Sequence, residues 1–138
     1  MISSDRGTGM GKVVERVRIT NIFHPEKSVE VDALIDTGAT MVVLPQDIVD
    51  KLGLRKVREV KVRYANKVEI KPVYRAVIIE IFGREGTFDV IGEEEGSQPL
   101  IGQVVLEVLD LIVDPKTRKL IPNPASPETP MIDIFMAM

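Results

Sequence analysis

Cysteine and tryptophan are absent from this chain of 138 residues, and histidine occurs once, at His24. Without cysteine the chain has no disulfide, no thiolate nucleophile and no cysteine-containing zinc site. One histidine argues against a multi-histidine metal site, and it excludes a Ser-His-Asp triad unless His24 is the base. His24 stands beside Pro25 in a polar segment, so we expect a solvated turn residue there. We therefore predict no metal ion and no cofactor.

A strong charge of one sign and a long apolar run are lacking too. The net charge is −3, which gives no electrostatic footprint for a nucleic-acid partner. The apolar runs are far shorter than a membrane span, and residues 1–12 are polar and glycine-rich, unlike a secretory signal. We expect a soluble cytoplasmic protein with a flexible arm over residues 1–12, in which Met1 or Met10 is the start of translation.

Aromatic residues make up only 4% of the chain, although 44% of it is hydrophobic. Valine, isoleucine and leucine must then fill the core, and this β-branched bias favours strands. Ten glycines and nine prolines interrupt the chain often, as an all-β domain requires. The length is enough for one domain, which we place at residues 13–121.

Alternating apolar and polar residues predict the strands, and proline, glycine and acidic residues mark the helices and turns. We expect an apolar run at 41–44, an exposed turn at 65–67, a turn at 83–86, and a solvated acidic loop from Glu93 to Pro99. Pro72 lacks an N–H, so its long strand must bend or lie at an edge there. The predicted strands are 13–22, 28–35, 57–64, 68–82, 87–91, 111–113 and 120–121, and the predicted short helices are 45–52 and 103–109.

The last seventeen residues, 122–138, differ from the rest. Four prolines between Pro122 and Pro130 predict an extended linker, and the octet Met131–Met138 is strongly apolar. Such an octet can add a strand to a sheet edge, lie in a cleft of the domain, or stay disordered. We favour docking because exposure of the large apolar residues of the octet is costly, and Phe135–Met136 is then a candidate cleavage site.

An apolar strand runs directly into an acid, a hydroxyl and a glycine at Ala33-Leu34-Ile35-Asp36-Thr37-Gly38-Ala39-Thr40. This tripeptide alone fits an ordinary turn that ends a strand. However, an aspartate at the end of a buried run is costly unless its oxygens accept hydrogen bonds. A glycine two residues later lets the backbone approach that carboxylate closely.

The segment resembles the active-site loop of the retroviral-type (retropepsin-like) aspartic proteases. Two further elements follow in that family's order: Tyr74–Gly83, similar to the strand after the flap, and Pro99–Leu106, where two apolar residues and a glycine precede a short helix. The resemblance implies a closed all-β barrel with one or two short helices and one lobe per chain. It also implies a homodimer that hydrolyses peptide bonds, with one catalytic aspartate from each subunit.

The need for a second subunit also follows from the residues. Aspartic proteolysis uses two carboxylates that share a proton around one water. No second Asp-Thr-Gly or Asp-Ser-Gly occurs among the nine aspartates. Asp32 is on the same strand face as Asp36, but four strand residues separate the two by roughly 13 Å. Either Asp36 meets its own copy across a two-fold axis, or there is no dyad.

By resemblance, each residue of the loop has a role. Asp36 acts as general base on the water in one subunit and as general acid in the other. Thr37 reaches across the dyad to the partner loop, Gly38 donates to the carboxylate, and Ala39 supplies no hydroxyl where a serine would. Ile101 and Gly102 form the second loop, and a flap tip closes over the peptide at Tyr64, Ala65, Asn66 and Lys67.

The chain departs from the viral pattern in two places. Its flap tip is not glycine-rich, and Thr40 or Met41 and Gln103 replace the acid and the arginine that form an ion pair in the viral enzymes. The likeness is therefore closer to cellular and microbial members. We predict a homodimeric aspartic endopeptidase; the alternative is a catalytically inactive module of the same fold that dimerises or binds peptides.

Overall fold

The computed structural model describes residues 12–134. Nine strands and two short helices make up this part of the chain. The first helix ends where Gly53 adopts a left-handed conformation with φ 65°. In chain order the elements are β1 Val14–Asn21, β2 Ser28–Ile35, β3 Val42–Pro45, α1 Gln46–Leu52, β4 Arg55–Tyr64, β5 Lys67–Ile81, β6 Arg84–Glu93, β7 Leu100–Ile101, α2 Gln103–Leu109, β8 Leu111–Val113 and β9 Leu120–Pro122.

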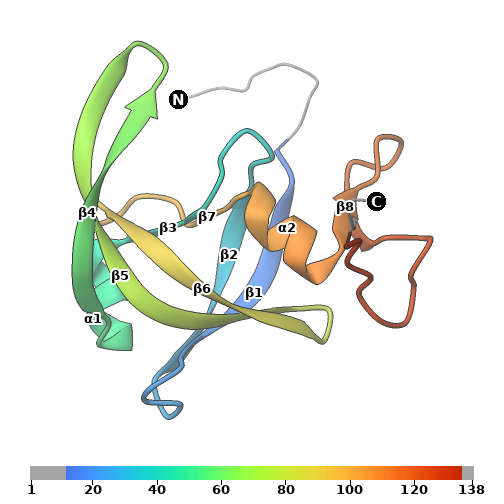
Figure 1. Cartoon of the computed structure of the whole chain (residues 1–138), viewed down its shortest axis with the longest axis horizontal. Coiled ribbons are helices and arrows are strands. Elements are labelled where there is room, and N and C mark those ends of the chain that lie inside the picture. The colour runs from blue at the N-terminus through green and yellow to red at the C-terminus, as the bar shows by residue number, and fades with distance from the viewer. Residues whose placement is uncertain (1–11, 135–138) are drawn as a thin grey trace.

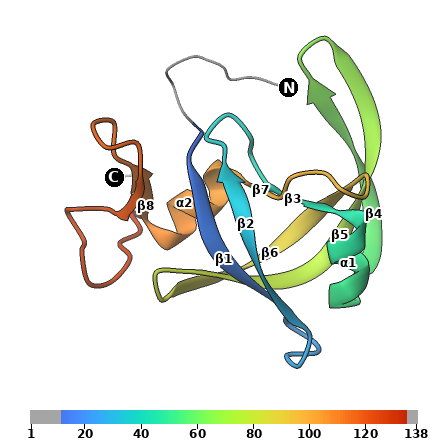
Figure 2. The same cartoon turned by 180° about the vertical axis from the view of Figure 1, so that it is seen from behind.

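Seven strands form one strongly curved sheet in the order β1-β2-β7-β3-β6-β5-β4 (Figures 1 and 2). An additional pairing joins β1 to β5, so hydrogen-bonded neighbours follow one another round a ring of six strands. β4 stays outside this ring and pairs with β5 alone. β8 and β9 form a separate two-stranded sheet. The all-β class is confirmed.

Aliphatic side chains fill the space inside the curved sheet. Ile19, Leu44, Ile79 and Ile101 are fully buried there, and Phe88 is the one aromatic residue among the buried hydrophobic side chains of residues 12–134. α2 closes one side through Val105, Leu106 and Leu109. The core is thus built from branched aliphatic residues, as the low aromatic content predicts. No helix within residues 12–134 is long and apolar enough to cross a membrane.

Most predicted elements lie where the periodicity placed them. β2, α2 and β8 have the predicted bounds. Pro72 lies one residue before the first β5–β6 pair, Val73–Ile91, in a part of β5 whose sole strand partner among the described residues is β4. The turn predicted at 83–86 is wrong in part, because β6 already begins at Arg84. His24 lies exposed in the β1–β2 turn, as predicted.

The side chain of Arg84 explains this difference, because it is buried and donates hydrogen bonds to backbone carbonyl groups near the C-terminal end of the chain. Its guanidinium donates to the carbonyl oxygens of Leu109 (3.1 Å), Asp110 (2.9 Å) and Ser126 (2.6 Å). Such contacts between distant segments leave no trace in local sequence patterns. A turn was expected at Arg84, but its side chain joins β6 to the segment after β9.

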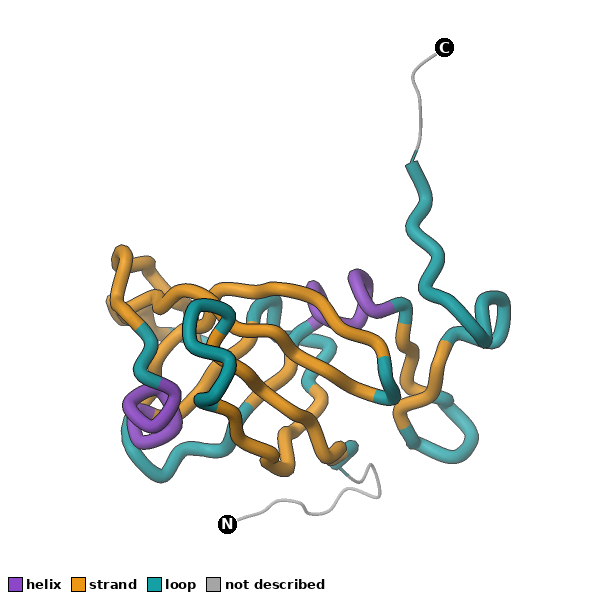
Figure 3. Tube along the Cα trace, turned by 90° about the horizontal axis from the view of Figure 1, so that it is seen from below, coloured by secondary structure: helices purple, strands orange, loops and turns teal. Residues whose placement is uncertain are grey.

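Asp110 holds the segment after β9 from the other side. It accepts hydrogen bonds from the Ser126 hydroxyl, from Asn123 Nδ2 at 3.0 Å and from the Met131 N–H at 2.9 Å. Beyond this anchor the described residues extend away from the strands (Figure 3). Met131, Ile132 and Ile134 are exposed, and Phe135–Met136 lies outside the described residues, as does most of the predicted arm at 1–12. The division into arm, domain and C-terminal segment stays a prediction.

Candidate active site

Asp36 is the first residue after β2, at the point where this strand pairs in parallel with β7. Ile35 lies opposite Ile101, and the Asp36 N–H donates to the Ile101 carbonyl at 3.0 Å. Both isoleucines are buried, whereas Asp36 is half-buried. The strand pair therefore delivers one carboxylate from the core to the surface at a fixed position.

Hydrogen bonds within the loop orient this carboxylate. The Gly38 N–H donates to Asp36 Oδ1 at 2.9 Å, and the Ala39 N–H donates to the Asp36 carbonyl at 3.1 Å. A Cβ on Gly38 would come within 3.3 Å of the same Oδ1, so glycine keeps this approach open.

A second loop clamps the first from behind. The Gln103 N–H donates to the Ala39 carbonyl at 2.8 Å, and the Val104 N–H donates to the Thr40 carbonyl at 3.0 Å. Gly102 is buried against this backbone: a Cβ there would lie 2.5 Å from the Met41 carbonyl oxygen. Only glycine fits such a contact, so the start of α2 lies directly beneath the aspartate loop.

A cleft of about 1040 Å³ opens above Asp36. The β4–β5 hairpin forms one wall, and β6 with the loop that follows it forms another. The lining combines apolar side chains with the charged side chains of Lys61, Arg63, Lys67, Glu69, Lys71, Glu93 and Glu94. The apolar lining residues include Ala39, Met41, Val43, Val60, Val62, Ile91 and Leu100.

The outer part of the β4–β5 hairpin is a two-stranded ribbon. Its last cross-strand pair is Tyr64–Lys67, and the turn between them consists of Ala65 and Asn66. β5 pairs with β6 only from Val73 onward, so the ribbon beyond that point has no other strand partner among residues 12–134. Figures 1 and 2 show its far end extending beyond the rest of the sheet.

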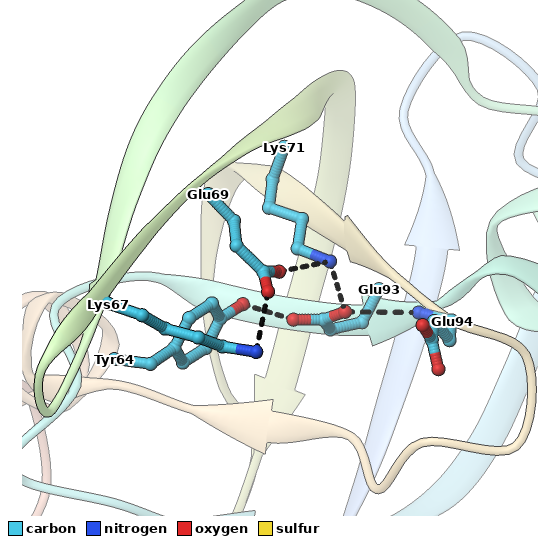
Figure 4. Close-up of polar contacts among 6 residues, drawn as sticks. All are labelled: Tyr64, Lys67, Glu69, Lys71, Glu93 and Glu94. Atoms are coloured by element: carbon cyan, nitrogen blue, oxygen red, sulfur yellow. Dashed lines mark hydrogen bonds and ion pairs between the residues drawn. The ribbon is translucent and has the colours of Figure 1, made fainter.

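One carboxylate of β6 ties this ribbon to the body. Glu93 accepts a hydrogen bond from the Tyr64 hydroxyl and an ion pair from Lys71 Nζ at 2.8 Å (Figure 4). Lys71 also contacts Glu69 at 3.2 Å, and Lys67 contacts the other oxygen of Glu69 at 2.7 Å. We call these five residues the flap latch. All five line the cleft.

The latch shifts the pKa values of its members. Burial, followed by the hydrogen bond to Glu93, raises the pKa of Tyr64 to about 12. Burial also acts to raise the pKa of Glu93, but the hydrogen bonds from Lys71 and Tyr64 outweigh it, so this pKa lies below its ordinary value. The hydrogen bond to Glu93 is the largest cause that raises the pKa of Lys71. Neutral Tyr64 and a charged Glu93–Lys71 pair are therefore the stable forms near pH 7.

Most other carboxylates near the site already form ion pairs with arginine or lysine. Asp32 pairs with Arg16 at 3.3 Å on the exposed face of β1 and β2, away from the loop. Of the remaining acids that line the cleft, Glu69 and Glu93 are paired with lysines, and Glu94 is exposed. Within residues 12–134, no three His, Asp or Glu side chains are grouped so that they could hold a metal ion.

A strand-end aspartate on a clamped loop, beneath a hairpin, is the arrangement that the sequence resemblance implies. The model of the family described as "gag-polyprotein putative aspartyl protease" matches residues 27–108. The chain belongs to this retroviral-type aspartyl protease family. No curated protein is significantly similar to it.

A solved structure supports the fold of this family member independently. The chain is similar to the EIAV protease complexed with the inhibitor HBY-793, with a TM-score of 0.53 and 17% identity. The match covers 70% of this chain and 86% of the viral protease. At this identity the likeness shows the retroviral protease fold alone.

The structure brings together most of the predicted site residues of this family member. Asp36, Gly38 and Ala39 line the cleft with Tyr64 and Lys67. Ile101 and Gly102 lie behind the loop, and Ala65 and Asn66 form the turn without lining the cleft. Thr37 is exposed, and its hydroxyl has no hydrogen-bond partner in the part of the chain that is described.

Sequence reasoning missed the flap latch. Glu93 was expected in a solvated acidic loop, but it is the last residue of β6 and is half-buried against Tyr64 and Lys71. An acidic run gives no sign of which member finds a cation in the folded chain. The one available signal was the basic and aromatic composition of the hairpin opposite it.

Proposed function

We propose that the chain is an aspartic endopeptidase that works as a homodimer, with Asp36 and its symmetry mate as the catalytic dyad. The observation that carries this proposal is the Asp36 loop itself. Its carboxylate accepts a hydrogen bond from Gly38, and the loop is clamped to Gln103 beneath a cleft of peptide size. Membership of the aspartyl protease family supports the same chemistry.

The reaction would proceed by direct attack of water. One Asp36 carboxylate is charged and takes a proton from the water held between the two subunits, while the protonated partner carboxyl donates to the substrate carbonyl. The tetrahedral intermediate then breaks down as a proton passes to the leaving amine. The two carboxyl groups titrate as a pair, so activity follows a bell-shaped dependence on pH.

Two features of the single chain support the partner's contribution. Asp32 is paired with Arg16, and Glu69 and Glu93 are paired with lysines, so of the acids that line the cleft beside Asp36 only the exposed Glu94 is left without an ion pair. The unpartnered Thr37 hydroxyl is exposed beside Asp36 and is suited to a hydrogen bond with the partner loop. The flap role of Tyr64, Ala65, Asn66 and Lys67 belongs to the same proposal, as does a cytoplasmic location.

The test is incubation of the pure protein with a diverse peptide library, with and without a statine-type inhibitor of aspartic proteases. We expect inhibitor-sensitive cleavage that is abolished in Asp36→Asn. This variant should fold and dimerise as well as the wild type, or better, because like-charge repulsion is removed. Wild-type turnover by Asp36→Asn would refute the assignment. Dimerisation without any cleavage would favour the inactive peptide-binding module.

A further inference from the structure

Charge is distributed very unevenly along this chain. Residues 55–75, which span the β4–β5 hairpin, hold eight of the 18 lysines and arginines and only two of the 21 acidic residues. The hairpin therefore has a net charge of +6, whereas the rest of the chain has −9. The overall charge of −3 conceals this basic region.

Several of these cations have no acidic partner. Lys56 pairs with Glu59 and Arg75 with Asp89, and the latch uses Lys67 and Lys71. Arg55, Arg58, Lys61 and Arg63 are all exposed, and none of them has an ion pair with any residue from 12 to 134. All four belong to β4.

β4 is also a free edge of the sheet. It stands last in the strand order and pairs with β5 alone, so its outer row of N–H and C=O groups has no strand partner within the described residues. Proteins often place charges on such an edge simply to prevent aggregation. A free edge is equally the place where an extended peptide can add a strand.

The side chains of β4 alternate in a way that specifies what such a peptide would carry. Lys61 and Arg63 share the outer face with Ile70 and Val68 of β5, as their cross-strand pairing shows. Val60 and Val62 lie on the opposite face and are half-buried, and they line the cleft, as do Lys61 and Arg63. A strand added beside β4 would thus meet cations on one face and valines on the other.

We infer that the free edge of β4 is a docking site for an extended acidic segment of a protein partner, in which acidic and apolar residues alternate. The acidic side chains pair with Lys61 and Arg63, and the apolar ones pack beside Val60 and Val62. Nucleic acid fits less well, because it has no main-chain N–H and C=O groups to continue the sheet. This docking goes beyond peptide cleavage and does not require it.

The test uses the Asp36→Asn protein, so that the probe is not consumed. A short fluorescein-labelled peptide of alternating glutamate and valine is titrated and followed by anisotropy. We expect saturable binding that weakens as salt rises from about 0.05 to about 0.5 M. Amide hydrogen exchange over residues 55–64 should slow on binding, because the free edge becomes paired.

The decisive variant is Lys61→Glu/Arg63→Glu, which turns two attractive cross-strand pairs into repulsive ones. We expect a loss of affinity of at least about tenfold. The matched control is Lys116→Glu/Lys119→Glu, which makes the same change in net charge at two exposed residues near β8 and β9. Thermal melts by circular dichroism confirm that both variants are folded.

Three outcomes would overturn the inference. They are equal loss of binding in both double variants, binding without protection of residues 55–64, and equally tight binding of a lysine–valine peptide or of a single-stranded oligonucleotide. Because the probe is bound and not cut, a failure here leaves the proposed protease activity unaffected. Loss of activity in Asp36→Asn likewise leaves docking at β4 unaffected.

Discussion

Gly102 makes the closest backbone approach at the site. A Cβ at this position would lie 2.5 Å from the Met41 carbonyl oxygen and 2.6 Å from the Thr40 carbonyl carbon. Backbone cannot rotate aside as a flexible side chain can, so the aspartate loop itself would have to move. The geometry around Asp36 thus depends on the absence of a single methyl group.

Gly102→Ala should therefore lower the free energy of unfolding by about 1–3 kcal/mol, the usual cost of an overpacked contact. Chemical denaturation measures this change. The neighbouring Gln103→Ala is the control, because its N–H still donates to Ala39 and its side chain makes only a 3.4 Å contact with Glu107. Equal stability of the two variants would show that the loop tolerates the methyl group.

At the scale of elements, the flap hairpin depends on the single carboxylate of Glu93. Glu93→Gln keeps the shape of the side chain but removes the charge that pairs with Lys71. We expect amide exchange over residues 60–71 to become about fivefold faster, equivalent to about 1 kcal/mol.

Glu94→Gln is the matched control for this change, because its side chain is exposed and forms no ion pair with any residue from 12 to 134. Faster exchange in both variants would mean that overall acidity holds the hairpin, and not the specific contact of Glu93.

The latch also predicts how the hairpin responds to pH. Because folding lowers the pKa of Glu93, the stabilisation by its carboxylate is complete above the ordinary value of 4.5 and is lost as the pH falls through the lower pKa of the folded state. Because folding raises the pKa of Tyr64, its contribution is complete below the ordinary value of 10.0 and is lost as the pH rises through about 12.

Protection of the hairpin amides, taken as the intrinsic exchange rate at each pH divided by the measured rate, should therefore be highest between these limits and fall in acid. The Glu93→Gln variant should lose the acid-dependent part of this profile. An unchanged profile in Glu93→Gln would assign the acid response to another group.

The segment after β9 depends in the same way on Arg84. Arg84→Met keeps the apolar stem but leaves the carbonyl groups of Leu109 and Ser126 without their buried donor. We expect a loss of about 2–4 kcal/mol in the free energy of unfolding, together with early proteolytic cuts between residues 120 and 131.

The exposed Lys119→Met serves as control for the Arg84 variant and should be close to neutral. Early cuts in Lys119→Met as well would show that the cuts do not depend on Arg84, and stable resistance in Arg84→Met would show that Asp110 alone suffices as the anchor.

At the scale of the whole molecule, the proposed homodimer with one aspartate from each chain predicts that activity depends on protein concentration. Activity per molecule should fall on dilution in step with the loss of dimer measured by light scattering. Thr37→Ala should raise the dissociation constant about tenfold, since two symmetric hydrogen bonds that together contribute about 1.4 kcal/mol are lost.

An exposed threonine of β6 provides the comparison for Thr37, and Thr87→Ala should leave the dissociation constant unchanged. A monomer with full activity at high dilution would contradict the two-fold arrangement.

The sequence predicts the elements better than their partners. Periodicity and glycine or proline boundaries locate β2 and α2 to the residue, because those signals are local. The roles of Arg84 and Glu93 depend on contacts with Ser126 and Tyr64, which are 42 and 29 residues away along the chain. No local pattern records such contacts. The basic hairpin was visible in the sequence, but only when charge is counted by segment.

The parallel pairing of Ile35 with Ile101 also determines when the site can form. The carbonyl groups of Ala39 and Thr40 accept hydrogen bonds from the N–H groups of Gln103 and Val104, which come more than sixty residues later in the chain. Pairings over such separations form late in folding. During synthesis, a nascent chain that has emerged only as far as β6 carries Asp36 on an unclamped loop. The order of translation therefore delays completion of the Asp36 site until α2 has left the ribosome.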